Sequence, residues 1–228
     1  GDDPAFSFAR GTHVDPTPEA VAFLETIRAR RVTTPERWLA LLRIARLDAH
    51  HAESHFSAKE TMPLLGEADV LEHEPISDLA IAVFDGAPRA DVLRAVLARL
   101  ATHPHAIVFG ALELAGLGLH GLDVLPGRAL DVAIDERRFE RIRVVGEAPA
   151  ELLALAAERD VELVREPVLR SPRGELRHYV RARSIAVTTH RHGVLPRSGA
   201  FAQSTGASKS TSNPIGTMPE GLMVGWLR

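Results

Sequence analysis

The chain has 228 residues, of which 45% are hydrophobic and 25% are charged, a composition typical of a globular protein with one large or two small domains. It contains no cysteine, which excludes disulfides, a thiol nucleophile, cysteine zinc sites and iron–sulfur clusters. No stretch approaches the roughly 20 apolar residues that a membrane span requires, and the first residues do not resemble a secretory signal. The sequence therefore predicts a soluble, cytoplasmic protein that does not contact a membrane.

The formal net charge of −3 is too small to indicate a nucleic-acid partner, but the charge is unevenly distributed. Residues 1–114 carry 11 Lys and Arg against 17 Asp and Glu, whereas residues 115–228 carry 16 against 13. The basic excess lies mainly between Arg165 and Arg197, and nearly all of it is arginine. Guanidinium groups suit planar, bidentate partners, so this segment is a candidate interaction surface.

The N-terminal region predicts a linker followed by a helix pair. Residues 1–16 are rich in Gly, Asp and Pro and are expected to form the linker. Thr17-Pro18-Glu19 and Thr34-Pro35-Glu36 each combine a capping hydroxyl, a proline at the first helical position and an acid in the first turn. Apolar residues follow at helical spacing. We therefore expect a helical segment over residues 17–60, with two helices joined by a short turn.

The middle of the chain, residues 61–170, alternates between strand-like and helix-like patterns. Asp78–Phe84 and Ala106–Gly110 predict buried strands, and the amphipathic run Asp91–Leu100 predicts a helix between them. Further short strands are expected over 129–134, 141–145 and 161–164, with an alanine-rich helix over 149–159. This order is typical of an α/β domain with a small, mostly parallel sheet and flanking helices.

The arginine-rich segment Glu175–Thr189 predicts a long extended stretch, and we expect residues 171–197 to form a projecting β-flap. Arginines that alternate with aliphatic residues suit an edge strand, because charge on an edge discourages uncontrolled pairing while allowing a designated partner. The expected contact residues are Tyr179, Arg181, Arg183, Ser184, Ile185, Val187, His190, Arg191 and Gly193. A solvated face and a nucleic-acid surface, with Tyr179 stacking on a base, remain alternatives. Residues 198–228 are dominated by small polar residues and are expected to be disordered.

Two motifs are candidates for a metal site and for a nucleotide site. His51 and His55 lie four residues apart in the second predicted helix, the spacing at which two imidazoles can share a metal ion. Ala52 stands where the HExxH motif has its glutamate and no third ligand is evident, so a solvated or substrate-facing helix end is the alternative. The turn Asp85–Arg89 holds one glycine where dinucleotide binding needs three, so no nucleotide site is expected there.

Three segments carry a resemblance to a known family. The first is HFS at 55–57 with LGEADVLEHEP at 65–75, similar to the family run "FS … L.GE.NVLRYRP". The second is RIRVVGEAP at 141–149, similar to "RLRLLGEAP", and the third is ELRHYVR at 175–181 with SIAVTTHRHG at 184–193, similar to "ELLRYLREQSVSxTxHRYG". In this order they resemble the C-terminal region of 1-pyrroline-5-carboxylate dehydrogenases. These enzymes belong to the aldehyde dehydrogenase superfamily and are often fused behind a proline dehydrogenase in bifunctional proline utilization A.

The resemblance implies a part in the NAD-dependent oxidation of glutamate semialdehyde to glutamate during proline catabolism, with FAD added where a proline dehydrogenase is fused. The closing run resembles a β-flap used in oligomer contacts or as a lid. Because that chemistry needs a cysteine thiolate, we expect a non-catalytic accessory domain that binds no cofactor and no metal itself. Its expected partners are a catalytic aldehyde dehydrogenase segment or subunit, or further copies in a homo-oligomer. The alternative is a small α/β binding or regulatory protein whose arginine-rich face recognises an anionic ligand or nucleic acid.

Overall fold

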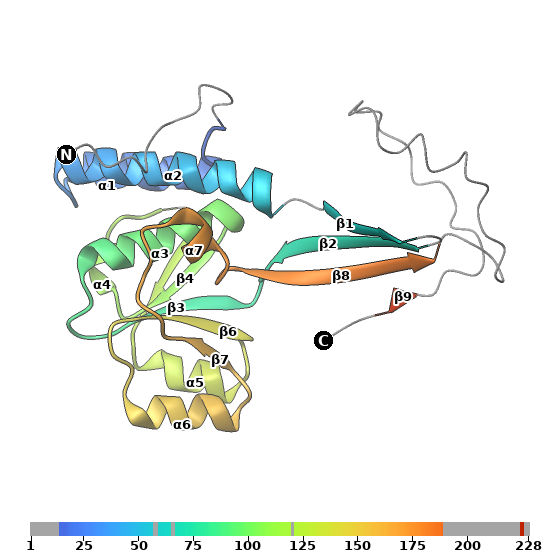
Figure 1. Ribbon diagram of the computed structural model, residues 1–228. Coiled ribbons are helices and arrows are strands. Elements are labelled where there is room, and N and C mark those ends of the chain that lie inside the picture. Colours follow the sequence, from blue (N-terminus) through green and yellow to red (C-terminus); the bar gives the residue numbers. More distant parts are fainter. Residues whose placement is uncertain (1–13, 57–58, 65–66, 120, 189–223, 226–228) are drawn as a thin grey trace, which may run out of the picture. The chain divides into compact units, whose positions relative to one another are not determined.

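The computed structural model describes residues 14–56, 59–64, 67–119, 121–188 and 224–225 (Figure 1). The chain divides into two compact units. The first comprises residues 1–56 and 75–181, and the second comprises residues 57–74 and 182–228. The expected linker and C-terminal tail fall almost wholly outside the described residues. Within the described part of the chain, every helix is too short or too polar to cross a membrane.

The N-terminal helix pair of the first unit is confirmed. It consists of α1 (Pro18–Ala29) and α2 (Pro35–His55). The Thr17 hydroxyl accepts a hydrogen bond from the amide of Ala20, and Thr34 does the same for Arg37, as expected of N-capping residues. Thr17 also donates to the carbonyl oxygen of Leu100 at 2.8 Å, which ties the start of α1 to the end of the helix α3 (Arg89–Thr102).

A five-stranded parallel sheet forms the centre of the first unit, which confirms the predicted fold class. Its strands, in the order β5-β4-β3-β6-β7 across the sheet, are β3 (Leu79–Val83), β4 (Ala106–Phe109), β5 (Leu122–Leu125), β6 (Arg141–Val145) and β7 (Glu162–Val164). Parallel strands need crossover connections, and helices supply them here. The crossover helices are α3 (Arg89–Thr102), α4 (Leu112–Ala115), α5 (Ala129–Asp135) and α6 (Ala150–Glu158), and a further helix, α7 (Pro172–Leu176), follows β7.

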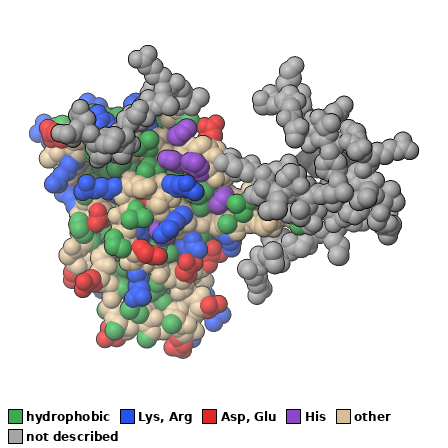
Figure 2. Space-filling view, in the orientation of Figure 1, with side chains coloured by type: hydrophobic (Ala, Val, Ile, Leu, Met, Phe, Trp, Pro, Cys, Tyr) green, Lys and Arg blue, Asp and Glu red, His purple; other side chains and the backbone are tan. Residues whose placement is uncertain are grey.

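Helices cover both faces of this sheet (Figure 1). Successive side chains of a strand point to opposite faces, and β3 shows this clearly. Leu79 and Ile81 join a core cluster with α1, α2 and α3, whereas Ala80 and Ala82 join a second cluster with α5 and α6. On the outside, charged side chains of both signs are spread over the face of this unit that Figure 2 shows. The core therefore consists of two apolar layers with the sheet between them.

Several elements differ from the sequence-based predictions. Residues 129–134 were expected to form a strand, but they belong to helix α5, in which Leu130, Ala133 and Ile134 are buried at helical spacing. Helix α3 is buried along Val92–Ala101 rather than on one stripe, because other helices cover the side that faces away from the sheet. The part of the chain from Pro172 to Leu176 forms helix α7, so the extended stretch starts later than predicted.

The second unit contains a small antiparallel sheet. Its strands are β1 (Lys59–Leu64), β2 (Glu67–Pro75), β8 (Val180–Thr188) and β9 (Val224–Gly225), in the order β1-β2-β8-β9. Strand β1 pairs with β2, with an irregularity between Glu60 and Met62, and Ala186 of β8 lies opposite Gly225 of β9. Residues 180–188 of the predicted flap segment, 171–197, therefore form a sheet strand, which lies between β2 and β9 rather than at the edge of the sheet as expected.

Candidate functional site

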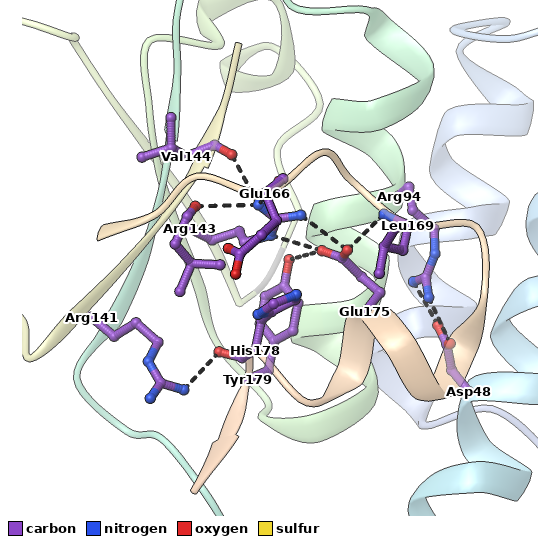
Figure 3. Close-up of polar contacts among 11 residues, drawn as sticks. Asp48, Arg94, Arg141, Arg143, Val144, Glu166, Leu169, Glu175, His178 and Tyr179 are labelled. Carbon is purple, nitrogen blue, oxygen red and sulfur yellow. Dashed lines mark hydrogen bonds and ion pairs between the residues drawn. The ribbon is translucent and has the colours of Figure 1, made fainter. Parts of the chain in front are cut away.

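A buried carboxylate, Glu175 of α7, is the centre of the most connected polar group among the described residues (Figure 3). It accepts hydrogen bonds from Nε and Nη2 of Arg143 at 2.9 and 3.0 Å. It also accepts from the Leu169 amide at 2.8 Å and from the Tyr179 hydroxyl at 3.2 Å. Burial raises the pKa of Glu175, but the Arg143 guanidinium and the Leu169 amide outweigh it, so this pKa lies below its usual value.

Arg143 of β6 extends this group to the backbone. Both Arg143 and Glu175 have side chains with no exposed surface. The Nη1 atom of Arg143 donates to the carbonyl oxygens of Val144 at 3.2 Å, Val164 at 3.2 Å and Glu166 at 2.7 Å. A planar guanidinium with five donors suits such a position, because it serves a carboxylate and three carbonyls at once. The Glu175 group therefore holds the segment that follows β7 against the sheet.

Tyr179 is a core residue. Its side chain has no exposed surface, and its hydroxyl is used by Glu175. The ring therefore offers no surface for stacking on a base. Its backbone carbonyl accepts a hydrogen bond from the Ile76 amide at 3.0 Å, which joins the two places where the chain passes between its units.

Two further arginines, Arg99 and Arg141, hold the backbone within the first unit, close to the two places where the chain passes between its units. Arg99 donates to the carbonyl oxygens of Ile76, Ser77 and His105, and its burial lowers its pKa to about 10. Arg141 donates to the carbonyl oxygen of His178 at 3.1 Å. The chain is thus held immediately after β2 and immediately before β8.

A second buried ion pair joins the helix layer. Asp48 of α2 accepts two hydrogen bonds from Arg94 of α3, at 2.8 and 2.9 Å, and both side chains are almost wholly buried. Burial has the larger effect here: it raises the pKa of Asp48 to about 6, although Arg94 acts to lower it.

The predicted contact residues of the flap occupy different environments. Arg181 pairs with Glu140 at 3.2 Å, and Arg183 pairs with Glu74 at 2.5 Å. Ser184 is exposed and Ile185 is half-buried. The side chain of Val187 and all of His190, Arg191 and Gly193 lie outside what the structure describes. The role of these residues in partner contact stays a prediction.

The arginines between β7 and β8 do not share one extended strand, as the sequence had suggested. Arg165 and Arg170 lie in the segment between β7 and α7, Arg173 lies in α7, and Arg177 follows α7 directly. All four side chains are exposed. The predicted arginine-rich face is therefore divided between a loop, a short helix and β8.

His51 and His55 do lie together on α2, with ring centroids 4.8 Å apart and ring planes 18° apart. Burial is the main cause that lowers the pKa of His51, followed by the neighbouring His55, His50 and Arg173. A group of three or more metal-ligating side chains does not occur among the described residues. The third ligand that a closed metal site needs is thus missing from this part of the chain.

A pocket of about 310 Å³ lies at the carboxyl ends of β3 and β4, where open α/β sheets bind ligands. Its lining includes Asp85, Gly86 and Arg89 in the turn before α3, together with Gly110 and Glu113 after β4. Two carboxylates against one guanidinium oppose a doubly charged pyrophosphate, and the turn carries a single glycine. The residues present therefore do not fit a dinucleotide cofactor.

Gly110 of this pocket has a packing role. Its φ is +91°, and a Cβ atom added there would lie 2.2 Å from the carbonyl oxygen of Val83. Only glycine tolerates this backbone conformation and this close approach. The glycine thus allows the chain to leave β4 in close contact with the end of β3. This packing role explains the glycine without a bound phosphate.

Comparison with known proteins gives similarity of fold only. No protein-family model and no curated protein sequence matches the chain. Proline Utilization A from Corynebacterium freiburgense is 20% identical, with a TM-score of 0.46 over 79% of this chain and 16% of that one. An aldehyde dehydrogenase from Bacillus cereus, in its NAD+ complex, is 15% identical, with a TM-score of 0.47 over 65% of this chain and 34% of that one. Lactaldehyde dehydrogenase from Escherichia coli is 13% identical, with a TM-score of 0.48 over 64% and 38%. The chain is similar to parts of these structures and spans 16% to 38% of their length.

Proposed function

We propose that this chain is a non-catalytic accessory domain of an aldehyde-dehydrogenase system that oxidises glutamate semialdehyde, and that it works by presenting β8 to the catalytic segment or subunit. The family-like motifs of the sequence support this proposal. One observation carries it furthest: three residues that match those motifs are structural. Arg143 comes from the second motif, Glu175 and Tyr179 come from the third, and they contact one another in the buried Glu175 group.

This buried group gives β8 a fixed starting point. Residues 176–179 lie between Glu175 and the strand, and their backbone is held by Arg141 and by the Ile76 amide. Preorganisation of this kind lowers the entropic cost of binding a partner. Because β8 lies between β2 and β9, a partner would contact it through an exposed face. A strand with a fixed origin suits such contact, or closure over a neighbouring site, better than a free loop does.

The chemistry would come from the partner. The chain has no cysteine to form a thiohemiacetal with an aldehyde, and the pocket at the ends of β3 and β4 does not fit a dinucleotide. In this proposal the chain contributes assembly and exclusion of water, and the partner contributes the nucleophile and the NAD site.

The experiment places charge on one face of β8. Ala182 and Ser184 are exposed and, being two residues apart on a strand, share a face. The double variant Ala182→Asp/Ser184→Asp is compared with the parent for association with a catalytic aldehyde dehydrogenase that oxidises glutamate semialdehyde. We expect association to weaken by at least about tenfold, which corresponds to roughly 1.4 kcal/mol.

A matched control adds the same two charges elsewhere. Ala154 and Ala157 are exposed on α6, so Ala154→Asp/Ala157→Asp should bind like the parent. Equal binding by both double variants would contradict the proposal. Repeating the measurement in high salt separates it from phosphate recognition, because affinity for phosphates falls steeply with ionic strength, whereas contact through apolar groups should change little.

A further inference from the structure

The pocket at the carboxyl ends of β3 and β4 is lined by charged side chains of both signs. Its volume of about 310 Å³ is near the lower end of the range, roughly 300–1,000 Å³, that is typical of small-molecule sites. Asp85 lies in the turn after β3, Arg89 is the first residue of α3, and Glu113 lies in α4. Because β3 and β4 are neighbours in the sheet, the turns that follow them bring these three charges to one hollow.

None of the three charged side chains is used inside the described part of the chain. All three are exposed, and none forms an ion pair or a side-chain hydrogen bond with another described residue. Arg99 and Arg143 of the same unit, by contrast, donate to carbonyl oxygens and to a carboxylate. The charges of Asp85, Arg89 and Glu113 are therefore available to a ligand in the pocket.

The rest of the lining includes apolar side chains. Val83, Phe84 and Val92 contribute to it, and Val92 is only 2% exposed as a member of the core. A ligand with a small aliphatic group would remove this apolar surface from water, which is favourable. The pocket therefore offers an apolar wall beside two carboxylates and a guanidinium.

This set of groups excludes most simple ligands. An anion would face both carboxylates, and a dication would face Arg89 without the third ligand that a closed metal site needs, since no group of three metal-ligating side chains occurs among the described residues. A neutral apolar molecule would take charges out of water without pairing them, which is costly. A zwitterion pairs both signs, because a carboxylate accepts parallel hydrogen bonds from a guanidinium and an ammonium group donates to carboxylates. Arg89 also lies at the positive end of α3, which favours a negative group.

We propose that this pocket binds a small apolar α-amino acid in its zwitterionic form. The ligand carboxylate is held by Arg89, its ammonium group by Asp85 and Glu113, and its aliphatic side chain by the apolar wall. This site is independent of the proposed contact through β8, since its lining lies wholly in the first unit.

The direct test is calorimetric titration of the whole chain with L-valine and with two of its analogues. Isobutylamine lacks the carboxylate and isovalerate lacks the ammonium group, so each should bind at least about tenfold more weakly than L-valine. Arg89→Gln and Glu113→Gln should each weaken L-valine binding by a similar factor. The controls Arg46→Gln and Glu151→Gln remove the same charges at exposed positions of α2 and α6 and should bind like the parent.

The variants also test which group holds which end of the ligand. Arg89→Gln should remove the preference for L-valine over isobutylamine, whereas Glu113→Gln should reduce the preference for L-valine over isovalerate. Equal binding of L-valine and isobutylamine by the parent would identify a site for cations and overturn the proposal. Equal effects of the pocket variants and their controls would also overturn it, as would the absence of L-valine binding up to about 10 mM.

Discussion

Each of the two buried ion pairs of the first unit joins an arginine to a carboxylate, but the pKa of the carboxylate is lowered in one pair and raised in the other. Glu175 accepts two hydrogen bonds from Arg143 and two more from Leu169 and Tyr179, and its pKa is lowered. Asp48 accepts two from Arg94 alone, and its pKa is raised to about 6. Burial penalises both carboxylates. At Asp48 burial outweighs the effect of Arg94, whereas at Glu175 the Arg143 guanidinium and the Leu169 amide outweigh burial.

The largest expected effect follows from removing the charge of Glu175. The variant Glu175→Gln leaves the Arg143 guanidinium buried without a counter-ion and should lower the free energy of unfolding by about 3–5 kcal/mol. Urea denaturation measures this. The matched control is Glu162→Gln, which breaks the partly exposed pair with Arg141 and should cost about 0–1 kcal/mol. Similar costs for the two variants would show that burial of the pair does not matter.

The next effect concerns pH. An acid whose pKa is raised on folding binds its proton more tightly in the folded state, so stability falls as pH rises from its unfolded to its folded pKa. For Asp48 this window runs from 3.8 to about 6. Relative to Asp48→Asn, the parent should therefore lose stability between pH 4 and pH 7, on the order of 3 kcal/mol. Urea unfolding of both proteins at each pH tests the sign, and a parent that gains stability over this range would contradict the account.

Glu175 should show the opposite sign. Its lowered pKa means that its contribution to stability is present above the unfolded pKa and is lost as pH falls through the folded one. Relative to Glu175→Gln, the parent should therefore lose its advantage on acidification. A contribution to stability that changes with pH in the same direction for Asp48 and Glu175 would contradict this difference between the two carboxylates.

The smallest expected effect isolates one of the extra donors. Tyr179→Phe removes the hydroxyl that donates to Glu175 but keeps the buried ring, so the cost should be about 0.5–1.5 kcal/mol. The pKa of Glu175 should rise at the same time, because a donor to the charged form is lost. Thermal unfolding combined with NMR titration of the carboxyl measures both changes. An unchanged pKa would assign the stabilisation of Glu175 to Arg143 and the Leu169 amide alone.

Local patterns in the sequence predicted many of the helices and strands of the first unit. The caps at Thr17 and Thr34 marked both N-terminal helices, and the apolar runs at 78–84 and 106–110 marked two central strands. The run from Ala129 was misassigned because its apolar residues suit both periods over so short a length. Its buried positions, Leu130, Ala133 and Ile134, follow the helical period.

The buried ion pairs could not have been predicted from local patterns. Asp48 and Arg94 are 46 residues apart, and Arg143 and Glu175 are 32 apart. Their burial follows from the packing of α3 and α7 between other elements, which no single helix pattern encodes. The burial of Tyr179 could not be predicted from local patterns either, because its neighbours in the sequence are mostly polar or charged although its ring lies in the core. The family-like motifs contained Arg143, Glu175 and Tyr179, but they did not predict that these three residues contact one another in the core.

The most direct test of the proposed accessory role is an NAD-dependent oxidation assay with glutamate semialdehyde. It is run on this chain alone, on the catalytic partner alone and on the two together. The account predicts no NADH formation by the isolated chain, and higher activity or a more stable assembly when the partner is present. NADH formation by the isolated chain would contradict the account, because it would require a nucleophile other than cysteine and a cofactor site that the pocket at the ends of β3 and β4 does not provide.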